Sequence, residues 1–113
     1  MKVHNYLKTE AIEDAPGVLH RVVVGADDGA PRFAMRVFEV KSGCTTPFHS
    51  HWWEHEVFVL SGEGIVKGKG KEEPIGEGTV VFVAPDEEHC FANTGNDVLH
   101  FICVIPLPDM ATP

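Results

Sequence analysis

Short apolar runs separated by glycine and proline make up most of the chain. Between these breaks β-branched and aromatic residues dominate, which is typical of β-strands rather than helices. The pattern predicts strands at residues 18–24, 32–40, 45–51, 55–60, 64–69, 79–83, 89–93 and 98–105. Turn-forming residues lie between them, as in Asp27-Asp28-Gly29 and Thr94-Gly95-Asn96. About eight short strands with regularly spaced turns indicate an antiparallel sandwich or barrel, and only residues 6–15 could hold a helical turn.

The length of the chain, 113 residues, is that of one domain. Apolar residues make up 43% of it, enough to fill a core without disulfides or a structural metal. We expect one domain over residues 1–113, with a barrel core at about 18–107 and an N-terminal arm at 1–17.

The charge balance narrows the possible partners. Nine Lys and Arg stand against seventeen Asp and Glu, a formal net charge of -8, and the nine cations are scattered. Binding to nucleic-acid phosphates needs clustered cations, so we expect no nucleic-acid partner. No apolar stretch approaches the ~20 residues of a membrane span, and the N-terminus lacks the apolar segment of a secretory signal. Three cysteines, an odd number, indicate reduced thiols and a cytoplasmic location.

Seven histidines remain to be explained, and three of them lie within seven residues. His49 and His51 stand at i and i+2, so on a strand both project from the same face and can bind one ion together. A straight continuation would put His55 roughly 20 Å from His49, so the chain must turn at residues 52–54 for His55 to reach the same ion. His89 follows a proline turn and opens a later strand. The hypothesis is that four neutral imidazoles surround one divalent ion.

Other interpretations of these residues carry less weight. A single histidine on a strand is usually at the surface or hydrogen-bonded, and we interpret His4, His20 and His100 in this way. The string His51-Trp-Trp-Glu54-His55 also matches the H-x-x-E-H pattern of zinc peptidases. That pattern requires a helix, which this strand-rich context disfavours.

Two separated segments resemble the motifs of the cupin superfamily. The first motif, G-x5-H-x-H-x3,4-E-x6-G, is matched by Gly43, His49, His51 and Gly62, with its last gap one residue short. The second, G-x5-P-x-G-x2-H-x3-N, is followed loosely by Gly78, Pro85, His89 and Asn93: six residues instead of five precede the proline, and the histidine comes one residue early. The resemblance covers roughly residues 18–107 and implies an all-β, single-domain jelly-roll barrel.

The spacing offers either His55 or Glu56 as the third ligand of the first motif, and their opposite strand parity lets only one of them face the ion. The chain is similar to short single-domain cupins in which four histidines bind manganese. On that resemblance the metal ligands are His49, His51, His55 and His89, and Glu56 points away. The cofactor would be one divalent transition metal, with manganese first and iron, nickel, copper or zinc as alternatives. Cupins of this length often pair, which implies a homodimer.

Further pocket residues follow from parity and neighbourhood. If Phe101 and Cys103 face the barrel interior, they line the cavity beneath the metal, and Phe48 and Trp53 border the ligands. Ordinary core packing explains each of these equally well. One of Arg36 and Glu39, which lie on opposite faces of their strand, should point inward.

The function that the resemblance favours is a metal-dependent oxygenase, dioxygenase-like, acting on a small organic molecule. Two alternatives remain open: a non-redox metal enzyme, either an isomerase or a lyase, and a cupin that binds or senses a small molecule without catalysis.

Overall fold

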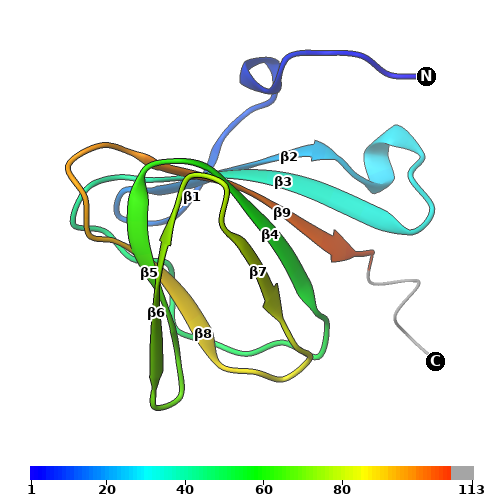
Figure 1. Ribbon diagram of the computed structural model, residues 1–113. Coiled ribbons are helices and arrows are strands. Elements are labelled where there is room, and N and C mark those ends of the chain that lie inside the picture. The colour runs from blue at the N-terminus through cyan, green and yellow to red at the C-terminus, as the bar shows by residue number, and fades with distance from the viewer. Residues whose placement is uncertain (108–113) are drawn as a thin grey trace.

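The computed structural model describes residues 1–107, and in them the prediction of an all-β fold is confirmed. A six-stranded sheet has the order β1-β2-β3-β9-β4-β7, and a three-stranded sheet has the order β6-β5-β8; the two are seen together in Figure 1. The strands are β1 (Ile12–Ala15), β2 (Val18–Val24), β3 (Phe33–Val40), β4 (His55–Ser61), β5 (Glu63–Gly68), β6 (Lys71–Gly76), β7 (Val80–Val83), β8 (His89–Asn93) and β9 (Leu99–Pro106). Two 3-10 turns, η1 (Tyr6–Lys8) and η2 (Ala26–Asp28), complete the elements. Among residues 1–107 no helix is long and apolar enough to cross a membrane.

Side chains point alternately to the two faces of a strand, and in β4 and β9 one of these faces is buried. In β4 every second residue from His55 to Val59 is buried, while Glu56 and Phe58 are exposed. β9 alternates in the same way from Leu99 to Cys103. The buried faces meet in one core that includes Ile75 and Phe91 from the smaller sheet.

Two residues secure the bends around this core. Asn93 ends β8, and its Nδ2 donates to the carbonyls of Val40 and Asp97, while its Oδ1 accepts from the Gly95 amide. Gly62 between β4 and β5 has φ 92°, and a Cβ there would lie 2.6 Å from the Val98 carbonyl oxygen. Only glycine fits this conformation and this close approach.

The prediction of a regular strand over residues 45–51 is wrong. The segment forms only isolated bridges to β8, at Thr45 with Ala92 and at His49 with His89. Pro47 lies between these bridges and has no N–H to donate, so a continuous ladder cannot form.

Two strands, β1 and β6, were not predicted from the sequence. β1 pairs with the start of β2, inside the segment for which only a helical turn was considered; the 3-10 turn η1 occupies residues 6–8 of that segment. β6 carries three charged residues and Pro74. Proline is tolerated there because β6 is an edge strand of its sheet.

Candidate metal centre

The fold brings histidines from three segments to one end of the core. His49 lies in the extended segment before the Trp52–Trp53 turn, and its amide and carbonyl exchange hydrogen bonds with those of His89 at 3.2 and 2.9 Å. His89 is the first residue of β8, and His55 is the first residue of β4. The turn that the sequence requires between His51 and His55 is therefore present.

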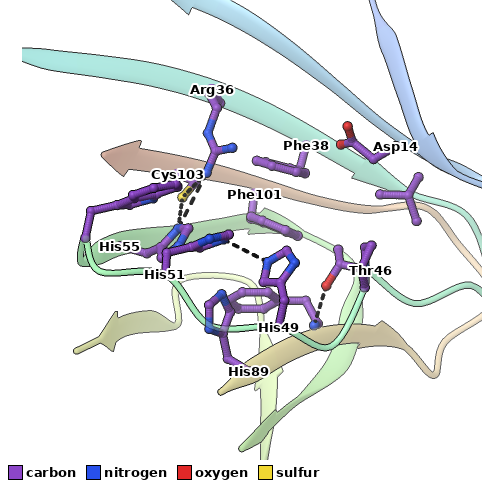
Figure 2. Close-up of a pocket in the computed structure, with 14 residues that line it drawn as sticks. Asp14, Arg36, Phe38, Thr46, His49, His51, His55, His89, Phe101 and Cys103 are labelled. Atoms are coloured by element: carbon purple, nitrogen blue, oxygen red, sulfur yellow. Dashed lines mark hydrogen bonds between the residues drawn. The ribbon is translucent and has the colours of Figure 1, made fainter. Parts of the chain in front are cut away.

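Three of these side chains form a group able to hold a metal ion. One ligand atom each from His49, His51 and His89 lies within 4.8 Å of the others, and we call this group the histidine cluster. The Nε2 atoms of His49 and His51 are 3.0 Å apart. Figure 2 shows the rings converging on one point from different segments.

His55 lies beside the histidine cluster but is not part of it. Its ring centroid is 4.8 Å from that of His89 and 5.2 Å from that of His51. The side chain is buried, whereas Glu56 is exposed on the other face of β4. The choice of His55 over Glu56 thus agrees with the direction of the two side chains, and four-histidine ligation stays a prediction.

Hydrogen bonds orient two of the rings for ligation. The Nδ1 atom of His89 is 2.8 Å from the Glu87 carbonyl oxygen, which can only accept, so Nδ1 carries the proton and Nε2 keeps a lone pair. The Nδ1 atom of His55 is 3.1 Å from Cys103 Sγ, and its Nε2 is buried without a hydrogen-bond partner. A buried polar atom normally has a partner, so this unpaired nitrogen beside facing imidazoles fits a bound metal.

Burial favours the neutral form of His49, His51 and His55, which is the form that ligates metals. Burial is the largest cause in each case: it lowers the pKa of His49, that of His51 to about 4 and that of His55 to about 3. The charges of neighbouring histidines and of Arg36 add to this effect. Protons therefore compete weakly with a metal at neutral pH.

The same pKa values predict that acid destabilises the metal-free protein. A histidine of the unfolded chain has a pKa near 6.5 and is protonated as the pH falls from 7 to 5. His51 and His55 of the folded protein stay neutral over this interval because their pKa values are about 4 and about 3. The free energy of unfolding should fall across this interval. Urea unfolding in the presence of a chelator at pH 7, 6 and 5 measures it, and His51→Gln should reduce the slope. If the free energy of unfolding of that variant falls with pH as steeply as that of the natural protein, the lowered pKa of His51 is contradicted.

A pocket of about 300 Å³ opens onto the cluster. Its lining comprises Asp14, Val18, Arg36, Phe38, Thr46, Pro47, His49, His51, Trp53, His55, His89, Phe91, Phe101 and Cys103. Three of the four pocket candidates from the sequence, Phe101, Cys103 and Trp53, are among these residues. The fourth, Phe48, is half exposed and is not among them.

Two charged residues of the pocket were not identified as site residues from the sequence. Arg36 is the inward member of the pair for which the direction was open, because Glu39 instead forms an ion pair with Arg21. Asp14 comes from β1, and its Oδ2 lies 2.6 Å from the Nδ1 of His20. No sequence signal marked Asp14, since its place depends on the pairing of β1 with β2.

Comparisons with known proteins agree with this architecture. The sequence model of the cupin domain family matches residues 36–105. An oxalate-binding protein of Thermotoga maritima is 41% identical over 66 residues, which cover 58% of this chain and 54% of that protein. The chain thus spans about half the length of this curated relative.

Two solved structures resemble the whole described fold. The polyketide cyclase RemF from Streptomyces resistomycificus superposes with a TM-score of 0.85 at 32% identity, covering 94% of this chain and 79% of the cyclase. A predicted oxalate decarboxylase from Thermotoga maritima has a TM-score of 0.79 at 28% identity, covering 94% of this chain and 99% of the other.

Proposed function

Because the chain belongs to the cupin domain family, we propose that His49, His51, His55 and His89 together hold one divalent transition metal. The observation that carries this proposal is the unpartnered, buried Nε2 of His55 beside the histidine cluster. Manganese is the first candidate because the chain resembles short single-domain cupins in which four histidines bind manganese, but imidazole also suits iron, nickel, copper and zinc.

We propose that the protein is a metal-dependent enzyme acting on a small organic molecule, and that its reaction is that of an oxygenase. A bound metal would supply a Lewis acid and, if redox-active, an electron carrier. The residues of the chain have separate tasks: the aromatic side chains of Trp53 and Phe101 exclude water, and Arg36 provides a fixed positive charge. The pocket volume suits a small substrate.

A non-redox reaction is the second candidate. It is favoured by the resemblance to a polyketide cyclase at 32% identity. Neutral ligands leave the full charge of a bound metal available to polarise a carbonyl, and zinc would support that reaction as well as manganese.

One experiment distinguishes the oxygenase from the non-redox enzyme. The protein is loaded in turn with manganese, iron or zinc and incubated with a dicarboxylate, a β-diketone and a catechol, with and without dioxygen. An oxygenase consumes dioxygen with manganese or iron and is inactive with zinc. Equal turnover with zinc under nitrogen would establish the second candidate, and a protein that binds none of the metals would contradict both.

We further propose a homodimer that buries the outer face of the six-stranded sheet. Exposed and half-buried apolar side chains adjoin one another there through the strand register: Met35 pairs with Val104, and Phe58 pairs with both Ile102 and Val80. Phe82 extends the patch and is 60% exposed. Contiguous apolar surface of this kind marks interaction sites.

Phe82→Glu should convert the dimer to a monomer, because a carboxylate cannot be buried in an apolar interface without a partner. Light scattering should give twice the chain mass of 12.4 kDa for the natural protein and that mass once for the variant. Leu7→Glu, at an exposed position in η1 outside the patch, is the control and should remain dimeric. A monomeric natural protein would contradict the proposal.

A cytoplasmic location is proposed on the state of the thiols. Cys44, Cys90 and Cys103 are all free, and the last two are buried. Free thiols of this kind persist in reducing compartments.

A further inference from the structure

We propose that Arg36 selects the ligand of the pocket, and that this ligand is a small organic anion whose carboxylate or enolate oxygen pairs with the guanidinium. The inference rests on the proposed function, because the other end of the anion would face the histidine cluster.

The fold directs Arg36 into the pocket. It lies in β3 opposite Cys103 of β9, on the face that is turned inward. Its Nη2 is 3.3 Å from Cys103 Sγ and 3.5 Å from His55 Nδ1. The guanidinium carbon lies 4.9 Å from the centroid of the Phe38 ring. These contacts hold the cation beside the histidines, as Figure 2 shows.

No carboxylate compensates this charge. Within residues 1–107 the acidic side chains form ion pairs with Lys2, Arg21, His20 and His100, but none with Arg36. The Nε of Arg36 is buried without a hydrogen-bond partner. Arg21, on the neighbouring strand, shows the usual arrangement, since it is paired with Glu39.

An unpaired cation that is partly buried has an energetic cost, which the structure does not offset with its own residues. An anionic ligand would supply the missing countercharge. The sulfur of Cys103 is a weak acceptor and cannot replace a carboxylate.

The pocket holds one acidic side chain, and this side chain does not pair with Arg36. The one acidic side chain lining the pocket is Asp14, and its carboxylate is already engaged by His20 at 2.6 Å. The pocket therefore favours anions over neutral or cationic molecules of the same size.

The test uses oxalate and its uncharged analogue oxamide as probes. Calorimetry on the manganese-loaded protein measures the affinity for each, with the metal content checked after every titration. Oxalate should bind at least ~10-fold more tightly than oxamide, and Arg36→Gln should weaken oxalate binding at least ~10-fold. Arg36→Lys keeps the charge without the planar fork and should give an intermediate affinity.

Arg32→Gln is the matched control, since Arg32 is an exposed arginine just before the same strand and its loss changes the net charge equally. This variant should bind oxalate like the natural protein. Thermal unfolding of the Arg36 variants verifies that they are folded. Their manganese affinity should be equal to or higher than that of the natural protein, because a nearby positive charge has been removed or moved.

Equal oxalate affinity in Arg36→Gln and the natural protein would overturn the inference, as would oxamide binding as tightly as oxalate or no binding of either probe. These results leave metal binding intact and the proposed function standing. A natural protein that binds no divalent metal would instead overturn the proposed function and the inference with it.

Discussion

His51→Ala should abolish stoichiometric metal binding, lowering the affinity about 100-fold or more, since even loss of a residue supporting a ligand costs 10–100-fold. The ring of His51 lies near each of the other three imidazoles: its centroid is 4.2 Å from that of His49, 5.2 Å from that of His55 and 5.8 Å from that of His89. Removing this ring takes one of the three ligand nitrogens from the histidine cluster and leaves His49 and His89, whose ring centroids are 5.2 Å apart. Metal content after dialysis and calorimetric titration with manganese both measure the effect.

His4→Ala is the control, because His4 is an exposed histidine of the N-terminal arm. Its metal content should equal that of the natural protein. Retention of one metal ion per chain by His51→Ala, with unchanged affinity, would show that the ion is held elsewhere.

Phe101→Ala should lower the free energy of unfolding by about 3–5 kcal/mol. The ring is 1% exposed and packs against Phe38 at 4.9 Å and Phe91 at 4.8 Å between centroids. Phe38 and Phe101 belong to the larger sheet and Phe91 to the smaller one, so this stack joins the two sheets. The loss includes the removed apolar contacts and a cavity that the rigid strands cannot close.

Urea unfolding of the metal-free protein checks the value, with Phe48→Ala as the comparison. Phe48 is half exposed, and its replacement should cost less than about 1 kcal/mol. A Phe101→Ala variant as stable as Phe48→Ala would mean that the aromatic stack does not hold the sheets together.

The sequence predicts strands best where β-branched and aromatic residues follow one another. β4 is such a case: the run from Val57 to Leu60 indicates a strand, although the residue types do not show which face is buried, because Phe58 and Leu60 are apolar and exposed. β6 lacks this signal: its Lys-Glu-Glu-Pro sequence resembles a loop, and it is a strand because the hairpin with β5 pairs it residue by residue. Tertiary pairing overrides local propensity there.

Some features of the site could also be predicted from the sequence and others could not. That His49 and His51 would face the same ion, and that the chain would turn before His55, could be inferred from strand geometry and the reach of a single ion. The direction of Arg36 could not, because parity states that Arg36 and Glu39 oppose each other but not which face is interior. Asp14 depends on a contact between distant segments that no local pattern encodes.

The indole of Trp53 lies flat on the imidazole of His51, with centroids 4.2 Å apart and planes 4° from parallel. The other tryptophan of the chain, Trp52, is 45% exposed and meets Trp53 edge to face at 4.9 Å. The protein thus has an intrinsic fluorophore in van der Waals contact with the ring that we expect to ligate the ion. Arrival of a paramagnetic ion should quench its emission, so occupancy of the centre can be followed in real time without any attached label.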